Sequence, residues 1–440
     1  MTLPGARFRP TWVDAAGLMC AVLYLGLASL ARGPGDPGVA SFLLVSAAIA
    51  ALTFAVYARS GKDPGRISVG RLLLWAVVFR AIGLFGGPFF EDDYFRYLWD
   101  GYRFAQDGTP YGLAPEAFFA DPAVPALFQG ILDRINFPEL ATIYGPATQL
   151  AFLLSYGVAP GSVAALQVIF ILFDLLTIGV LLRLAPPRAV LLYAWCPLVV
   201  KEVAFTAHPD GFAVFFVLAA VLLAKRERLH AAAALLAFGV AAKVLALVLA
   251  PFVLRPIRWT HGAVFGGVLA ILYLPFAWQG GSDLPTLLVF ARDWEFNASV
   301  FALLTPLLPN AAARVVCGGL FLAAAAWLYF RDRDPGGNVP PGDRLYGLLL
   351  VLAPVVNPWY LLWVLPFAAI RPSLWAWTAS VAVLLSYATG LNLQDMNLHP
   401  FGHPPWVPVA EYGMVALALA AGVAWRRKAG PREGTACTAA

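Results

Sequence analysis

Apolar segments about as long as a transmembrane helix recur from one end of the chain to the other. Three of them, at 12–31, 39–57 and 72–88, precede a long polar segment, and eleven of similar or shorter length follow it. Because an α-helix rises 1.5 Å per residue, about 20 apolar residues cross the hydrocarbon core of a bilayer. The pattern therefore predicts an all-α polytopic membrane protein with about 13–14 transmembrane helices, several of them short and kinked or sheltered by neighbours.

The amino-acid composition supports a membrane protein and argues against a soluble or nucleic-acid-binding protein. Of the 440 residues, 60% are hydrophobic and only 12% are charged, whereas soluble domains carry about 25% charged residues. The net charge of +5 does not indicate nucleic-acid binding, because the basic residues fall in loops that we expect on the cytoplasmic side of the membrane. The four cysteines are far apart in the sequence and suggest neither a metal site nor a disulfide framework.

The longest polar segment, 89–143, differs from the other loops in the sign of its charge. It contains nine acidic and three basic residues, which gives a net charge of −6. Cytoplasmic loops of membrane proteins are enriched in Lys and Arg, so we expect this segment on the outer face. Its aromatic residues suit helices that lie at the level of the lipid headgroups. The apolar segment that follows, 144–160, is short, and we expect an interfacial helix there.

These observations predict a single domain. Residues 1–428 would form one transmembrane bundle with an extracytoplasmic loop at 89–160, and residues 429–440 would form a disordered cytoplasmic tail. The sequence has no repeat of fixed period. It also has no glycine-rich nucleotide-binding loop and no serine- or zinc-hydrolase motif. An enzyme that works outside the cytoplasm, away from nucleotide sugars, needs a donor that the membrane delivers.

Charged and aromatic residues concentrate at the start of the polar segment. On a helix, Asp93, Arg96, Tyr97 and Asp100 would share one face. A carboxylate beside an arginine at the mouth of a membrane protein is a candidate for acid–base chemistry. The alternative is a solvated loop whose acids keep it outside. The acidic residues of this stretch are Glu91, Asp92, Asp93 and Asp100.

Further charged residues lie at helix boundaries or inside apolar segments. Lys201 could contact a lipid phosphate or pair with Glu202, and the sequence does not decide between these two possibilities. Lys243 lies in an apolar segment, where a lysine is unfavourable unless it faces a cavity or a partner. Arg80 and Asp174 lie inside predicted spans, and we expect each to face the bundle interior, where it pairs or lines a cavity.

Two later segments combine aromatic with polar residues. The segment 292–297 is either a solvated loop or part of a site. The segment 357–363, Asn-Pro-Trp-Tyr-Leu-Leu-Trp, suits an aromatic belt at the lipid boundary, although such rings also line lipid grooves or stack on sugars. His399 and His403 are four residues apart, but nearby prolines argue against a helix and therefore against a metal pair. We expect no metal and no cofactor.

Several short motifs occur in an order that is similar to that of a known family. They are Asp93-Tyr-Phe-Arg-Tyr-Leu-Trp-Asp-Gly101, Gly108-Thr-Pro-Tyr111, Ile143-Tyr-Gly-Pro146, Trp195-Cys-Pro-Leu with His208-Pro-Asp210, the Lys243 segment that ends at Pro251, Trp294-Glu-Phe-Asn297 and Asn357-Pro-Trp-Tyr-Leu-Leu-Trp363. Over about residues 70–370 the chain resembles bacterial membrane glycosyltransferases of the GT-C type. The group it resembles most is that of the polyprenyl-phosphate-mannose-dependent mannosyltransferases and their uncharacterised relatives. Tyr-Gly-Pro at 144–146 departs from the family's more frequent Tyr-Pro-Pro.

The resemblance implies an enzyme of the bacterial cytoplasmic membrane that acts at the outer face. It would move a sugar, with mannose the first choice, from a polyprenyl-phosphate donor to a hydroxyl of a lipid or glycan acceptor, among membrane lipids. The family's general base is an acid of the first outer loop, which corresponds to Asp93, with Asp92 as the alternative. Cations would stabilise the departing phosphate. The expected substrate-binding residues are Arg96, Tyr97, Asp100, Tyr144, Lys201, His208, Lys243, Arg292, Trp294, Asn297, Trp359 and Tyr360.

Two other functions stay open at the level of sequence. A lipid-linked sugar flippase or other transporter would also be polytopic, but it would be expected to show repeats and charges near the bilayer midplane. The charged residues here gather toward one face, which favours an enzyme. A noncatalytic envelope-assembly subunit would tolerate replacement of Asp93 by Asn, whereas an enzyme that uses this base would not.

Overall fold

The computed structural model describes residues 11–33, 37–62, 67–331 and 339–428, so the predicted tail at 429–440 lies outside the described residues. Within these ranges the chain is helical, and the one β-type pairing is an isolated bridge between Phe296 and Val355. The α-helices are α1 (Trp12–Ala31), α2 (Val39–Ser60), α3 (Val69–Gly86), α4 (Tyr94–Asp107), α5 (Ala126–Leu132), α6 (Pro146–Val158), α7 (Val163–Leu184), α8 (Pro187–Ala194), α9 (Pro197–Val200), α10 (Asp210–Lys225), α11 (Leu229–Ala242), α12 (Ala250–Val253), α13 (Trp259–Ala277), α14 (Leu284–Asp293), α15 (Val300–Leu304), α16 (Asn310–Arg331), α17 (Gly342–Leu352), α18 (Leu365–Ile370), α19 (Leu374–Ala382), α20 (Gly390–Leu393) and α21 (Trp406–Lys428). Short 3₁₀ or π segments are η2 (Pro115–Phe118), η3 (Lys201–Phe205), η4 (Val244–Leu249), η5 (Pro358–Trp363) and η6 (Val383–Tyr387).

The prediction of an all-α polytopic membrane protein is confirmed. In the described part of the chain, seven helices are long and apolar enough to cross a membrane: α1, α2, α3, α7, α13, α16 and α21. An eighth span would combine Pro197–Phe205 with α10, although these two pieces meet at an angle of 115°. Three apolar helical segments are shorter, at Leu229–Ala242, Val244–Val253 and Leu374–Tyr387. These numbers are below the 13–14 spans that the apolar segments predicted.

Proline accounts for most of this difference. Four apolar segments that predicted whole spans, at 189–203, 244–254, 345–356 and 360–370, each contain one proline and are broken into shorter pieces or end early. Proline lacks the backbone N–H that a helix interior requires, and its ring clashes with the preceding turn. Such breaks are tolerated where neighbouring helices shelter the freed backbone groups.

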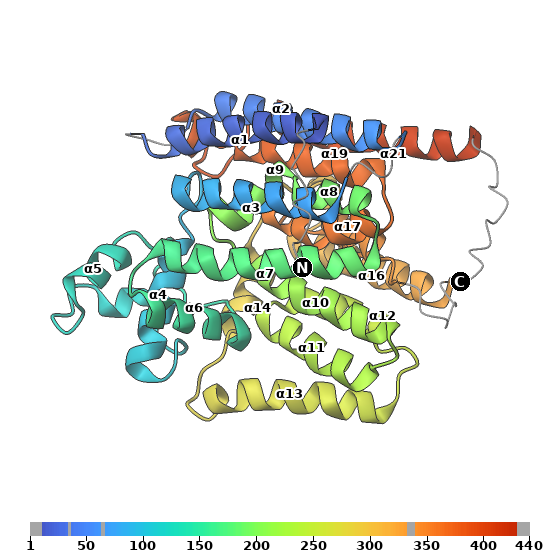
Figure 1. Cartoon of the computed structure of the whole chain (residues 1–440). Helices are drawn as coiled ribbons and strands as arrows, with labels where there is room; N and C mark the ends of the chain where they lie inside the picture. Colours follow the sequence, from blue (N-terminus) through green and yellow to red (C-terminus); the bar gives the residue numbers. More distant parts are fainter. Residues whose placement is uncertain (1–10, 34–36, 63–66, 332–338, 429–440) are drawn as a thin grey trace, which may run out of the picture.

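The longest helices run side by side, and the helices of the first polar segment gather at one end of them (Figure 1). There α4 packs against α5 and α6, and α6 also contacts α7 and α11. The short apolar segment 144–160 thus forms a 13-residue helix, α6, that joins this end cap to the bundle. We call the helices α4, α5 and α6 at this end of the bundle the α4–α6 cap.

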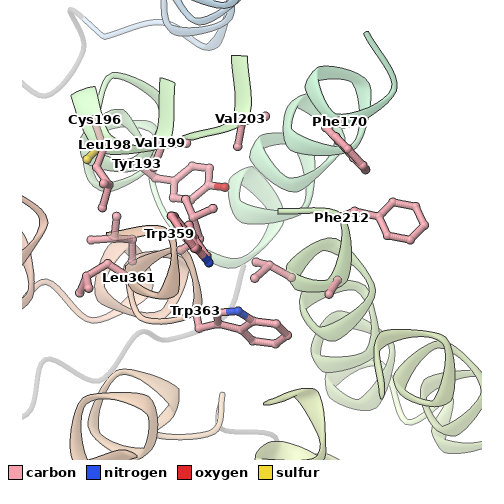
Figure 2. Packing of buried hydrophobic residues seen from close by; sticks show 14 of the residues in the cluster. Phe170, Tyr193, Cys196, Leu198, Val199, Val203, Phe212, Trp359, Leu361 and Trp363 are labelled. Carbon is pink, nitrogen blue, oxygen red and sulfur yellow. The ribbon is translucent and has the colours of Figure 1, made fainter. Parts of the chain in front are cut away.

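The core brings together chain segments that are distant in sequence. Figure 2 shows Tyr193 of α8, Phe212 of α10 and Trp363 of η5 among the buried side chains. Trp359 is 8% exposed and Trp363 is 1% exposed. The segment 357–363 is therefore not a belt at the lipid boundary, and the structure corrects that interpretation: η5 is packed inside the bundle.

A charged pair lies in the middle of the bundle. The guanidinium of Arg80 donates to the carboxylate of Asp174 at 2.6 Å and to the carbonyl of Ala194 at 2.7 Å. The hydroxyl of Tyr193 donates to the other carboxylate oxygen at 2.7 Å. Both charged side chains are at most 1% exposed. This confirms that Arg80 and Asp174 face the interior, and it shows that they pair with each other.

Candidate active site

A cavity of about 1150 Å³ lies where the α4–α6 cap meets the bundle. Its wall is built from the segment before α4, the loop before α6, the turn before α10, the end of α11, helix α14, η5 and parts of the segment 386–402. A cavity of this size holds a drug-sized or sugar-phosphate ligand. The predicted site residues that line it are Asp92, Asp93, Arg96, Tyr144, His208, Lys243, Trp294, Trp359 and Tyr360.

Asp93 lies at the N-terminus of α4 and keeps its carboxylate accessible. It is the N-cap residue, and its side chain is 36% exposed. Its Oδ2 is 3.6 Å from Nε2 of His208. The neighbouring Asp92 also lines the cavity, but its carboxylate accepts a hydrogen bond from the side-chain amide of Asn136. Asp93 therefore faces a second titratable side chain, that of His208.

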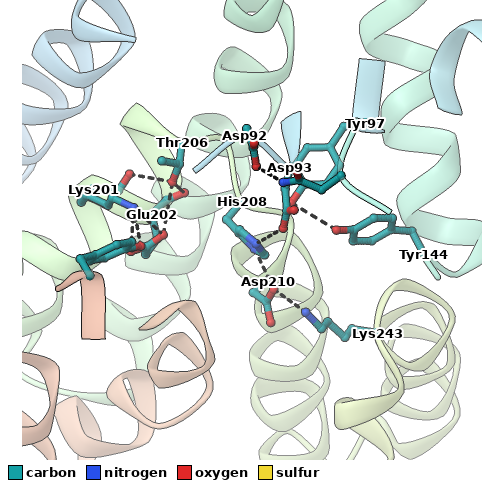
Figure 3. A network of polar contacts seen from close by, with 12 residues as sticks. Asp92, Asp93, Tyr97, Tyr144, Lys201, Glu202, Thr206, His208, Asp210 and Lys243 are labelled. Carbon is teal, nitrogen blue, oxygen red and sulfur yellow. Dashed lines mark hydrogen bonds and ion pairs between the residues drawn. The ribbon is translucent and has the colours of Figure 1, made fainter. Parts of the chain in front are cut away.

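His208 begins a chain of hydrogen bonds that continues through Asp210 to Lys243 (Figure 3). Trp363 also donates to Asp210, and we call these four residues the His208 network. Nδ1 of His208 is 2.9 Å from Oδ2 of Asp210. Nζ of Lys243 donates to the same oxygen at 2.7 Å, and the indole N–H of Trp363 donates to Oδ1 at 2.7 Å. The Asp210 carboxylate is thus fully buried but compensated by three donors, as a buried charge requires.

The local backbone conformation positions His208 and Lys243, the two ends of this network. Ala207 has a positive φ of 55°, and Pro209 is the last residue before α10 begins at Asp210. Lys243 is the residue at which α11 ends, and its backbone is extended. A Cβ on Gly145 would lie 2.2 Å from the Ala241 carbonyl oxygen. Only glycine therefore permits the chain before α6 to pass so close to the end of α11, which explains the Tyr-Gly-Pro sequence here.

Lys201 belongs to a second group of polar side chains, separate from the His208 network. Its Nζ is 3.4 Å from Oε1 of Glu202 and donates to the hydroxyl of Tyr387. That hydroxyl donates in turn to Glu202 at 2.7 Å. All three side chains are buried, and Lys201 does not line the cavity. We call these residues the Lys201 cluster; of the two sequence interpretations, pairing with Glu202 is the one that the structure shows.

Glu91 lies between the two groups, at the wall of the cavity. Burial raises the pKa of its carboxyl well above the usual range, and the nearby charge of Lys201 acts in the opposite direction. The carboxylates of Asp93 and Glu202 raise the pKa further. Glu91 therefore favours its protonated form, in which it can donate a hydrogen bond to a cavity ligand.

Arg96 lines the cavity, whereas Tyr97 is buried inside the α4–α6 cap and lies outside the cavity wall. The guanidinium of Arg96 donates to the carbonyls of Leu140 at 2.9 Å and Phe137 at 3.0 Å, so it ties the loop before α6 to α4. The buried ring of Tyr97 stacks on Phe152, and its hydroxyl is 3.4 Å from that of Tyr144. The shared face predicted for Asp93, Arg96, Tyr97 and Asp100 thus points partly to the cavity and partly into the cap.

Three other predicted substrate-binding residues are outside the cavity wall. Asp100 is buried and accepts hydrogen bonds from Thr142 and from the Gln149 amide, the latter at 2.9 Å; burial raises its pKa to about 6. The amide of Asn297 donates to Glu411 at 3.1 Å. Arg292 has a side chain 76% exposed that pairs with Asp293. Their observed contacts are with the protein itself.

Sequence reasoning missed three residues that organise the site. Asp210 was visible only as part of a His-Pro-Asp motif, although an acid at the first position of a helix is itself a signal for a buried N-terminal charge. Trp363 was visible only as the last residue of the 357–363 motif, and its partner Asp210 is 153 positions away. Tyr387 contacts Glu202, 185 positions away, and no local pattern marks it. Within the described residues, no group of three or more His, Cys, Asp or Glu side chains could hold a metal ion.

The comparison with protein families identifies the class to which this helical membrane protein belongs. Residues 36–257, half of the chain, match the model of the N-terminal domain of alpha-(1->6)-mannopyranosyltransferases. The chain belongs to this family of membrane mannosyltransferases of the GT-C type. Searches of curated proteins and of solved structures gave no match. The matched region contains Asp93, His208, Asp210 and Lys243, whereas α14, η5 and the segment 386–402, which complete the cavity wall, follow it.

Proposed function

We propose that this mannosyltransferase takes its mannose from a polyprenyl phosphate and transfers it to a hydroxyl of a lipid or glycan acceptor, with Asp93 as the general base. The observation that carries the proposal is the accessible carboxylate of Asp93 in a cavity whose wall also contains Lys243. A transfer of this type needs a base for the acceptor proton and a cation for the phosphate that leaves.

The proposed transfer forms one bond to mannose and breaks another. The Asp93 carboxylate removes the proton of the acceptor hydroxyl while the oxygen of that hydroxyl attacks the anomeric carbon of mannose. The bond between that carbon and the phosphate oxygen breaks, and the phosphate keeps the electron pair. Lys243, with 18% of its side chain exposed, is the cavity cation that can approach the growing negative charge. Arg96 adds positive charge at the wall.

Aromatic side chains in the cavity wall support the binding of a sugar. Tyr144, Trp294, Trp359 and Tyr360 all line it, and the faces of such rings pack against the apolar face of a hexose. The polyprenyl chain is a membrane lipid, which agrees with the apolar helices of the bundle. We place the α4–α6 cap and the cavity at the outer face of a bacterial cytoplasmic membrane, because the segment 89–143 carries a net charge of −6.

The test is a transfer assay with the purified full-length protein. Polyprenyl-phosphate mannose and other polyprenyl-phosphate sugars are offered with lipid and α-mannoside acceptors, and products are followed by mass. Asp93→Asn should lower turnover by about 10³-fold or more, within the range that general bases contribute, without lowering the unfolding temperature.

Asp133→Asn is the matched control, because Asp133 is exposed at the end of α5 and outside the cavity. It should retain turnover within about two-fold. Near-normal transfer by Asp93→Asn would remove Asp93 from the mechanism and leave a different base or a noncatalytic role.

A further inference from the structure

One buried nitrogen at the centre of the site has no hydrogen-bond partner among the described residues. It is Nε2 of His208, a residue that is 2% exposed. The nearest carboxylate is that of Asp93, with Oδ2 at 3.6 Å. Buried polar atoms are almost always satisfied, so an orphan atom that points toward a reactive group calls for an explanation.

The other contacts of His208 fix its ring in one orientation. Nδ1 donates to the carboxylate of Asp210 at 2.9 Å, and the ring stacks on Trp359 with the centroids 4.0 Å apart. Tyr97 packs edge-on from the α4 side. With the Nδ1 proton held by Asp210, Nε2 carries the lone pair of the neutral imidazole and is free to accept a proton.

We propose that His208 is the proton acceptor for Asp93, so that the two residues act as a relay. Asp93 takes the proton of the acceptor hydroxyl during transfer, and Nε2 of His208 then takes this proton from the Asp93 carboxyl. The Asp93 carboxylate is restored, and the imidazolium releases the proton to water when the products leave. This inference rests on the proposed function and assigns the next step at the same site.

Basicity favours the direction of this step. In model compounds the pKa of imidazole is about 6.5 and that of an aspartic acid carboxyl about 3.9. Nδ1 of His208 is 2.9 Å from the Asp210 carboxylate, so an anion lies beside the ring when Nε2 takes up the proton. A separation of 3.6 Å is longer than a hydrogen bond, but catalytic contacts often shorten when the substrate binds.

Other titratable groups surround this pair, and one of them is a cation in direct contact with the His208 network. Lys243 neutralises part of the Asp210 charge and thereby limits how strongly Asp210 attracts an imidazolium. The tyrosines are neutral at physiological pH, because burial raises the pKa of each. The charged or titratable groups around Asp93, His208 and Asp210 are Glu91 and Asp92 before α4, Tyr97 in α4, Tyr144 before α6, Lys243 after α11 and Tyr360 in η5.

The experiment is a pH–rate profile of mannose transfer for the full-length protein, with polyprenyl-phosphate mannose as donor and octyl α-mannoside as acceptor. In His208→Gln, kcat should fall about 10²-fold, while KM for both substrates stays within about two-fold. The acid limb of the remaining activity should move at least about one pH unit lower, because Asp93 alone then sets it. His230→Gln, the same change at the exposed start of α11, should leave the profile unchanged.

Other outcomes would overturn either the relay alone or the relay together with the proposed function. Full turnover in His208→Gln, an unmoved acid limb, or a raised KM with unchanged kcat would overturn the relay and leave the proposed function standing. Absence of transfer by the unmodified protein with every donor would overturn the proposed function and the relay together.

A second variant keeps the test valid if His208→Gln does not fold. Trp363→Phe keeps an aromatic ring in the core but removes the N–H that donates to Asp210 at 2.7 Å. The less neutralised Asp210 would then attract the imidazolium more strongly. The acid limb should therefore move about half a pH unit or more to higher pH. An acid limb at the position of the unmodified protein would contradict the relay.

Discussion

Two lysines of this protein have similar neighbours but lie in different surroundings. Lys201 is beside Glu202 and over the ring of Tyr387 at 3.9 Å, and Lys243 is beside Asp210 and over the ring of Tyr360 at 4.9 Å. The Lys201 side chain is 3% exposed and lies outside the cavity wall, whereas that of Lys243 is 18% exposed and lines the cavity.

This difference shows how the role of a buried lysine can be inferred from its surroundings. A charge that is enclosed on all sides by its partners cannot approach a ligand, because any movement would leave it and its partner unpaired in an apolar region. A charge that is anchored by one partner but exposed to a cavity keeps hydrogen-bond capacity for a phosphate. By this criterion we expect the Lys201 cluster to stabilise the fold, and we propose that the His208 network contributes to the reaction.

The largest predicted effect separates these two roles directly. Lys201→Met should cost about 3–5 kcal/mol of folding free energy, because it leaves Glu202 buried without its cation. Lys243→Met should lower kcat/KM for the polyprenyl-phosphate donor about 10- to 100-fold, the loss of one charge-assisted hydrogen bond worth about 1.5–3 kcal/mol. Thermal unfolding in detergent and donor kinetics, measured on both variants, check the pair.

The two methionine variants are matched controls for each other, since each removes one ammonium group and keeps an apolar side chain. If Lys201→Met lowers donor affinity more than stability, the Lys201 cluster would belong to the binding site. If Lys243→Met leaves donor kinetics unchanged, Lys243 would have a structural role, and the two lysines would not differ in function.

A smaller effect concerns a carboxyl that the cap buries. The pKa of Asp100 is raised to about 6 in the folded protein from 3.8, so the folded state binds this proton more tightly than the unfolded state. Stability should therefore fall as pH rises from about 4 to about 6, by up to about 3 kcal/mol. Asp100→Asn should remove this part of the pH dependence and be more stable than the unmodified protein at pH 7.

The measurement is the unfolding midpoint of both proteins at several pH values between about 4 and 8. Subtracting the curve of unfolding midpoint against pH of Asp100→Asn from that of the unmodified protein isolates the contribution of Asp100. The contributions of other groups cancel, including that of Glu91, whose pKa is also raised by burial. Parallel curves would show that the Asp100 carboxyl titrates normally in the folded state.

The smallest effect is expected at a cation that the structure leaves in solvent. Arg292 pairs with the adjacent Asp293 at the surface, and such exposed pairs contribute little. Arg292→Ala should change the donor KM less than about two-fold and the unfolding temperature by about 1 °C or less. Arg96→Ala is the comparison, because it removes a guanidinium that holds the cavity wall, and it should impair transfer far more. A large rise in KM for Arg292→Ala would place this loop in the donor site.

The sequence by itself determined the class of the protein and much of the neighbourhood of its site. Long apolar segments predicted a helical membrane protein because a helix satisfies the polar backbone groups of such a segment inside the bilayer, and about 20 residues span it. Arg80 and Asp174 were predicted to face the interior because isolated charges are unfavourable inside apolar segments, and they pair there. Lys243 and the acidic stretch around Asp93 were singled out by the same scarcity of charge, the family resemblance chose Asp93 within that stretch, and both residues line the cavity.

Only the tertiary structure decided which of the polar residues work together. Lys201 and Lys243 are equivalent in sequence terms, and their difference comes from what packs around them. Asp210 gains its role from Trp363, which lies 153 residues away, and a partner at that distance leaves no local pattern. Proline-containing segments predicted as whole spans became short pieces, because backbone breaks depend on shelter from neighbouring helices, which a local pattern of apolar residues does not describe.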